Sequence, residues 1–86
     1  MPRTTRKRAN TPNPKLAFGI VLRALREQRG LSQDSFAHLS GYHRNYIGQL
    51  ERGEKSPSLS ALFNLSEALE LRPSQLVKMI EQRQRS

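Results

Sequence analysis

The sequence of 86 residues contains no cysteine and no tryptophan, and its aromatic residues are limited to three phenylalanines and two tyrosines. Without cysteine, disulfide bonds and thiolate metal sites are excluded, so packing or oligomerisation must stabilise the fold. No apolar run approaches the roughly 20 residues that span a bilayer, and the basic N-terminus lacks the apolar segment of a signal peptide. We therefore expect no membrane partner and a cytoplasmic protein that stays where it is synthesised.

Acidic residues are also scarce: seven Asp and Glu stand against fifteen Lys and Arg, which gives a formal net charge of +8. This excess favours an anionic partner, whether nucleic acid, an acidic protein or an anionic membrane; a basic solvated surface is the simpler alternative. A membrane surface is disfavoured because the basic residues do not border a large apolar face.

Side chains for catalysis are few as well. The two histidines, His38 and His43, do not form a recognisable nucleophile–base arrangement with a serine, and the sequence has no glycine-rich phosphate loop. His38 is expected on the surface, and His43 has no metal-ligating residues near it in the sequence. We therefore predict that the protein is not an enzyme and that it uses no metal and no cofactor.

The composition changes along the chain. Residues 1–14 contain three prolines, four basic residues and no acid, which predicts a disordered arm. Its basic residues either lie in a DNA minor groove, raise non-specific affinity or only keep the chain soluble. They are Arg3, Arg6, Lys7 and Arg8. A folded domain is predicted over residues 15–81, followed by a frayed tail over residues 82–86.

Apolar residues recur at helical spacing within that domain. Phe18, Val21, Leu22 and Leu25 fall at i, i+3, i+4 and i+7, and Gly30 ends this first helix. Four further helices are predicted, over residues 33–40, over residues 44–52, after a cap at Ser58 and from Pro73. No stretch alternates between apolar and polar residues as a strand would. The predicted fold class is therefore all-α, with five helices.

The second and third of these helices are joined through a glycine-containing turn, which is the geometry of a helix-turn-helix. In the third helix Ile47 and Leu50 face the core, and the opposite face carries no acid. That face comprises Arg44, Asn45, Gly48, Gln49 and Arg52. Arginine pairs with guanine in the major groove, whereas asparagine and glutamine pair with adenine. Gly48 either lets the backbone approach DNA, makes room for its neighbours or packs tightly against another helix.

The segments RGLSQDSFA, GYHRNYIGQLERG and SPSLSALFNLSEAL together resemble the DNA-binding domain of the Cro and lambda-type (XRE-like) repressors, over residues Phe18 to Leu71. Within that family, GYHRNYIGQLERGEKSPSL is most similar to the controller proteins of restriction-modification operons. The resemblance implies a five-helix domain that binds a near-palindromic operator in double-stranded DNA as a dimer. It also implies a bacterial or phage protein that works at the nucleoid.

The same resemblance implies roles for individual residues. Base-reading positions are His43, Arg44, Asn45 and Gln49, and phosphate-contacting positions are Gln33, Arg52, Lys55, Ser56 and Ser58. Gln33 would in addition brace the third helix. Arg26 and Glu51 match a structural ion pair. His43 stands where Ser or Thr often caps the reading helix, so it is either a weak cap or a contact to phosphate or base.

The C-terminal region has more apolar residues than one small helix usually buries, and in the family this helix contributes to the dimer. The predicted interface residues are Leu71, Leu76, Val77, Met79 and Ile80. No second domain that could bind an effector is present, so we expect no small-molecule effector. Two alternatives use the same fold, namely an antitoxin of a toxin–antitoxin pair and a module that bridges proteins.

Overall fold

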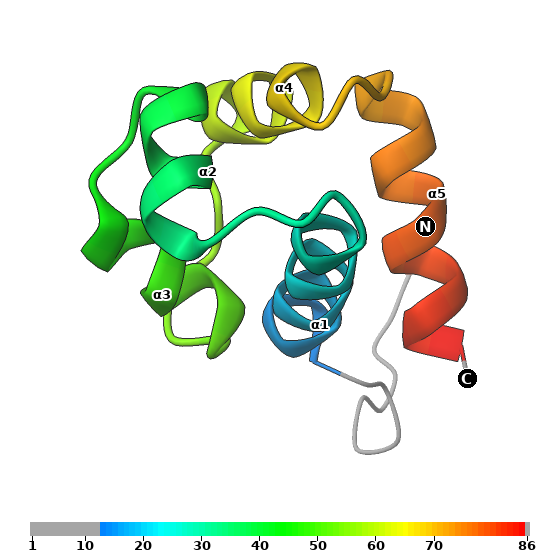
Figure 1. Ribbon diagram of the computed structural model, residues 1–86. Coiled ribbons are helices and arrows are strands. Elements are labelled where there is room, and N and C mark those ends of the chain that lie inside the picture. The colour runs from blue at the N-terminus through cyan, green and yellow to red at the C-terminus, as the bar shows by residue number, and fades with distance from the viewer. Residues whose placement is uncertain (1–12, 86) are drawn as a thin grey trace.

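The computed structural model describes residues 13–85. They form five helices, α1 (Pro14–Gln28), α2 (Gln33–Ser40), α3 (Arg44–Glu51), α4 (Leu59–Ala68) and α5 (Pro73–Arg85) (Figure 1). No residue in this described part of the chain belongs to a strand. The prediction of an all-α fold with five helices is therefore confirmed.

The helices extend slightly beyond both ends of the domain predicted over residues 15–81. α1 begins at Pro14, because Asn13 caps it by accepting the backbone N–H of Lys15, and proline suits the first helical position. α5 continues past residue 81 to Arg85, so residues 82–85 are helical. An i,i+4 ion pair between Glu81 and Arg85 supports this last turn. The basic residues of the predicted arm, within 1–12, lie outside the described residues.

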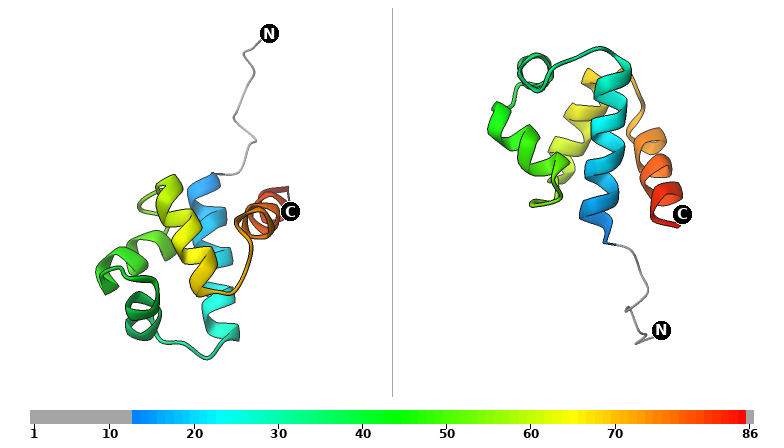
Figure 2. Two further views of the ribbon diagram at one scale, coloured as in Figure 1. Left: turned by 90° about the horizontal axis from the view of Figure 1, so that it is seen from above. Right: turned by 60° about the horizontal axis from the view of Figure 1, so that its bottom comes forward.

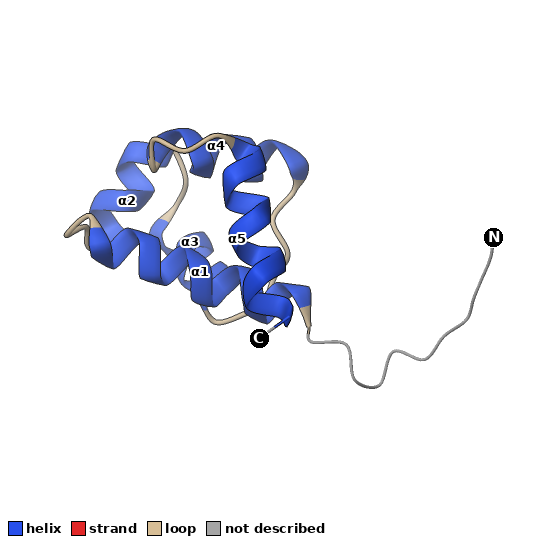
Figure 3. Ribbon diagram, turned by 90° about the vertical axis from the view of Figure 1, so that its right-hand side faces the viewer, coloured by secondary structure: helices blue, strands red, loops and turns tan. Residues whose placement is uncertain are grey.

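The five helices form a closed ring of neighbours. α1 packs against α3 and α5, α2 packs against α3 and α4, and α4 packs against α5. Figures 1 and 2 show the α2–α3 pair at one end of the molecule and α5 at the other, with α1 between them. Viewed from the α5 side, α4 lies across the end of α5 (Figure 3). The helix-turn-helix thus lies at one edge and is supported from behind by α1 and α4.

The ring encloses one apolar core to which every helix contributes. Its fully buried large side chains are Leu22, Phe36, Ile47, Leu50, Leu65, Leu69 and Leu76. α1 and α3 approach each other especially closely at Gly19, where an added Cβ would lie 2.5 Å from the backbone oxygen of Leu50. α3 therefore rests directly on the backbone of α1. No helix of the described residues is both long and apolar enough to cross a bilayer.

Candidate nucleic-acid interface

The outer face of α3 is polar, and its inner face is buried. Ile47 and Leu50 are completely buried, whereas Arg44 and Asn45 are exposed and Gln49 is half-buried. A polar hollow of about 240 Å³ lies on this face, and its walls are Gln33, Arg44, Asn45, Gly48, Gln49 and Arg52. The fold therefore brings together predicted DNA-contacting side chains from both α2 and α3.

A buried network fixes the orientation of α3. The Arg26 guanidinium donates to both carboxylate oxygens of Glu51, at 2.6 and 3.0 Å, and to the backbone oxygen of Leu31 at 2.7 Å. Gln33 Nε2 donates to the same carboxylate at 3.0 Å. The hydrogen bond to Glu51 is the main reason why the pKa of Arg26 is raised above its ordinary value. The predicted ion pair is present, and through Gln33 it joins α1, α2 and α3.

His43 caps α3. Its Nδ1 accepts the backbone N–H of Asn45 at 3.0 Å, which leaves Nε2 as the ring nitrogen that can donate. The side chain is otherwise exposed. Of the two alternatives that the sequence left open, the unbound structure contains the cap, and an Nε2–H donor remains available for an acceptor on DNA.

Both arginines on the face of α3 are paired with carboxylates from outside the helix. Arg44 lies 3.3 Å from Asp34 in the first turn of α2, and Arg52 lies 2.7 Å from Glu54 in the following loop. The prediction that this face is free of acid holds for α3 alone and is wrong for the assembled surface. The spacing of residues within α3 could not predict these two ion pairs, because Asp34 and Glu54 lie outside the helix.

Gly48 lies beneath the Arg52 side chain. An added Cβ would come within 2.9 Å of Arg52 Nη1, and its other near neighbours also belong to Arg52. Tight packing of Gly48 against another helix is therefore ruled out. The glycine that packs this way is Gly19, which the sequence analysis did not single out because a glycine inside an apolar stripe has no distinct pattern.

The loop between α3 and α4 carries the remaining predicted phosphate contacts. Lys55 and Ser56 are exposed. The Ser58 hydroxyl accepts the backbone N–H of Ala61 at 3.0 Å and so caps α4. Ser58 therefore has a structural role besides its predicted contact with DNA. Among the described residues, no cluster of His, Asp and Glu could hold a metal ion.

The predicted dimer interface is only partly at the surface. Leu76 is completely buried in the core of a single chain, so its assignment to an interface is wrong. Leu71, Met79 and Ile80 are half-buried, and Val77 is 46% exposed. Phe63 on α4 is 53% exposed, although it was not among the predicted interface residues. The spacing of apolar residues on α4 indicates a helix but does not single out Phe63.

Comparison with known proteins assigns the chain to a protein family. The family model HTH_3, described as helix-turn-helix, matches residues 22–76, more than half of the chain. The chain belongs to this helix-turn-helix family. The resemblance to XRE-like regulators and the fold class predicted from the sequence are therefore confirmed.

Several relatives are controller proteins. Control protein C.SmaI from Serratia marcescens is 46% identical over 48 residues, which cover 56% of this chain and 57% of that relative. Control protein C.BamHI from Bacillus amyloliquefaciens is 35% identical over 68 residues, 78% of this chain and 84% of that protein. The crystal structure of the restriction-modification controller protein C.AhdI from Aeromonas hydrophila has a TM-score of 0.70 and 44% identity, covering 72% of this chain and 94% of that one.

Proposed function

We propose that this protein is a transcriptional regulator that binds a near-palindromic operator as a homodimer and inserts α3 into the major groove. The observation that carries the proposal is the outer face of α3, where Arg44, Asn45 and Gln49 surround a polar hollow while Ile47 and Leu50 fix the helix from behind. The similarity to restriction-modification controller proteins supports the regulatory role, in a bacterial or phage operon.

The proposed base contacts and phosphate contacts come from different parts of the surface. Arg44, Asn45 and Gln49 project from α3 and have the donors and acceptors that discriminate base pairs in the major groove. His43, at the N-terminus of α3, adds one N–H donor. Contacts to phosphate would come from Gln33, Arg52 and the 55–58 loop, and these set the register of the protein on DNA without reading sequence.

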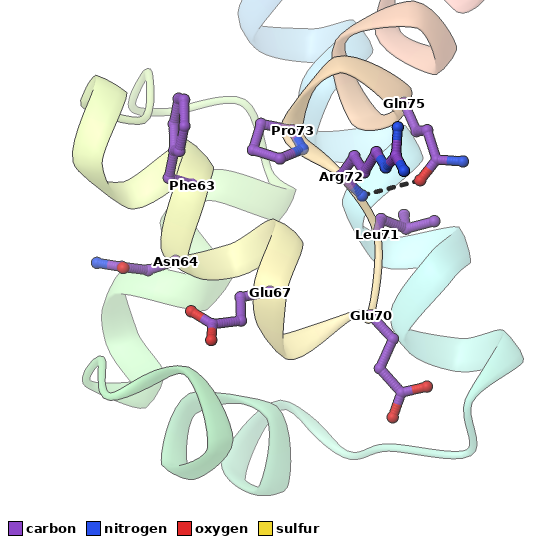
Figure 4. Close-up of a pocket in the computed structure, with 8 residues that line it drawn as sticks. All are labelled: Phe63, Asn64, Glu67, Glu70, Leu71, Arg72, Pro73 and Gln75. Carbon is purple, nitrogen blue, oxygen red and sulfur yellow. Dashed lines mark hydrogen bonds between the residues drawn. The ribbon is translucent and has the colours of Figure 1, made fainter.

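The dimer would form through a surface at the junction of α4 and α5 where apolar side chains lie among polar ones. An open hollow of about 740 Å³ lies there, and Figure 4 shows Phe63 of α4 and Pro73 of α5 among its walls. Val77 is one helical turn beyond Pro73 and so lies on the same face of α5. This α4–α5 surface (Phe63, Leu71, Pro73 and Val77) revises the interface predicted from the sequence: it keeps Leu71 and Val77 and adds Phe63 and Pro73.

The experiment is selection from a random-sequence DNA pool at about 0.15 M salt, with the wild-type chain and Arg44→Ala in parallel. We expect the wild-type chain to enrich an inverted repeat, and Arg44→Ala to lose preference at one base pair per half-site. Each lost base contact should cost about 1–3 kcal/mol. If no motif is enriched and both proteins bind with equal, salt-sensitive affinity, the proposed function is wrong and a protein-bridging or antitoxin role replaces it.

A further inference from the structure

The end of α3 places an acidic residue beside the reading face. Gly53 has φ of +73°, a conformation that glycine adopts without strain. The turn is closed by two backbone bonds, from Gly53 N–H to the Leu50 oxygen and from Glu54 N–H to the Gln49 oxygen. This pattern ends helices and reverses the chain. Glu54 is thereby held next to Arg52, two residues away.

Two neighbours, Glu54 and Gly48, constrain the Arg52 guanidinium. Its Nε and Nη2 donate to the two carboxylate oxygens of Glu54 at 2.7 and 3.3 Å. Its Nη1 lies against Gly48, in space that any larger side chain would occupy. The absence of a side chain at Gly48 is therefore what allows the guanidinium to lie flat on α3, at the edge of the polar hollow.

Stability does not explain this arrangement. Both side chains are more than half exposed, and exposed ion pairs contribute little to folding. The pairing does affect charge: Arg52 has a raised pKa and Glu54 a lowered pKa, chiefly because of their mutual hydrogen bond. Both side chains are ionised at neutral pH, as exposed Arg and Glu ordinarily are, and together they carry no net charge.

We propose that Glu54 is a specificity-determining residue. It holds Arg52 against Gly48, from where Arg52 can contact only the phosphate beside an operator-bound α3, and keeps it from binding arbitrary phosphates. The inference rests on the proposed function, in which α3 reads DNA. A released Arg52 would act as one more mobile cation on the DNA-facing surface. It would add affinity for every sequence and so lower the ratio of operator binding to non-specific binding.

The test compares the wild-type chain with Glu54→Gln on two duplexes of equal length, the selected operator and a scrambled sequence. Binding is measured by fluorescence anisotropy from 0.1 to 0.4 M KCl. We expect Glu54→Gln to bind the scrambled duplex about fivefold more tightly at 0.15 M salt, with a salt slope steeper by about one, as for one added phosphate contact. Operator affinity should rise less, so that discrimination falls.

Two further variants separate the mechanism from a simple change of charge. Glu27→Gln removes the same charge from another exposed Arg–Glu pair, Arg23–Glu27 on α1, outside the proposed DNA and dimer contacts. It should change the affinity for neither duplex measurably. In an Arg52→Gln background, Glu54→Gln should lose its effect, because the gain depends on releasing Arg52.

The outcomes are distinct. A wild-type chain that does not discriminate between the duplexes overturns the proposed function and this inference with it. A wild-type chain that discriminates, with Glu54→Gln discriminating equally well, overturns the inference alone. The inference is also overturned if Glu54→Gln tightens binding to the scrambled duplex just as much in the Arg52→Gln background. Repulsion between the Glu54 carboxylate and DNA phosphates would then be the cause, without any role for Arg52.

Discussion

Individual side chains in this molecule differ in how strongly their surroundings constrain them. The Arg26 and Glu51 side chains are 9% and 3% exposed, and each has further hydrogen bonds besides their pair. The Arg23–Glu27 pair on α1 has 64% and 54% exposure and one short contact of 3.1 Å. Similar ion pairs can therefore have very different consequences, since desolvation makes an unpaired buried charge costly.

Replacement of Glu51 should destabilise the fold strongly. Glu51→Ala leaves the Arg26 guanidinium buried without its carboxylate and removes the acceptor of Gln33. We expect the free energy of unfolding to fall by about 3–5 kcal/mol, measured by urea denaturation. The control Glu27→Ala, in the exposed pair, should cost less than about 1 kcal/mol. An equal loss in the free energy of unfolding in the two variants would mean that the Glu51 network contributes no more to stability than an exposed ion pair.

The Arg52–Glu54 pair leads to a prediction about pH. Because the hydrogen bond lowers the folded-state pKa of Glu54, the pair stabilises the folded chain above the ordinary carboxyl pKa. That contribution is lost as the pH falls through the lowered value. An NMR titration of the Glu54 side-chain carboxyl should show this low pKa, and Arg52→Gln should return it to the ordinary range. An unchanged titration in Arg52→Gln would assign the shift to another cause.

The sequence predicts single-residue roles only where the pattern is local or the family supplies it. Ile47 and Leu50 follow from spacing on one helix, and Arg26–Glu51 followed from the resemblance. The contact between Asp34 and Arg44 could not be predicted from spacing, because it depends on the angle at which α2 meets α3. Leu76 was misassigned because periodicity identifies an apolar face but does not show whether one chain is enough to cover it.

At the level of helices, two glycines differ in the atoms that an added side chain would meet. Gly19 on α1 meets backbone atoms of α3, which cannot move without displacing the whole helix. Gly48 on α3 meets only the far end of the flexible Arg52 side chain. Both positions lose helix propensity relative to alanine, by up to about 1 kcal/mol. Alanine substitution should nevertheless lower the free energy of unfolding at Gly19 and leave it unchanged or raise it at Gly48.

Alanine substitutions at these two positions form a matched pair. Gly19→Ala should lower the free energy of unfolding by about 1–3 kcal/mol, because the strain of overpacking against α3 exceeds the gain in helix propensity. Gly48→Ala should leave stability unchanged or raise it by up to about 1 kcal/mol, because Arg52 can move aside. Thermal melts followed by circular dichroism compare the two. A destabilised Gly48→Ala would show that the surroundings of Gly48 are more rigid than its contacts indicate.

The whole molecule combines a closed ring of helices with apolar side chains that the ring does not cover, among them those of the α4–α5 surface. Leu76 and Val77 are adjacent on α5, yet the first is completely buried and the second is 46% exposed. Adjacent side chains on a helix point about 100° apart, so one belongs to the core of the chain and the other to the α4–α5 surface. Substitutions at these neighbours can therefore separate folding from association.

Val77→Asp should dissociate the proposed dimer and leave the fold intact, because it would place a carboxylate in the proposed interface while the core is unchanged. Sedimentation equilibrium at tens of micromolar should report a dimer for the wild-type chain and a monomer for Val77→Asp, with similar melting temperatures. Leu76→Ala should instead lose about 2–5 kcal/mol of folding stability through a core cavity. If Val77→Asp remains dimeric, the two-fold contact lies elsewhere; a wild-type monomer would mean that the chain meets its operator without prior association.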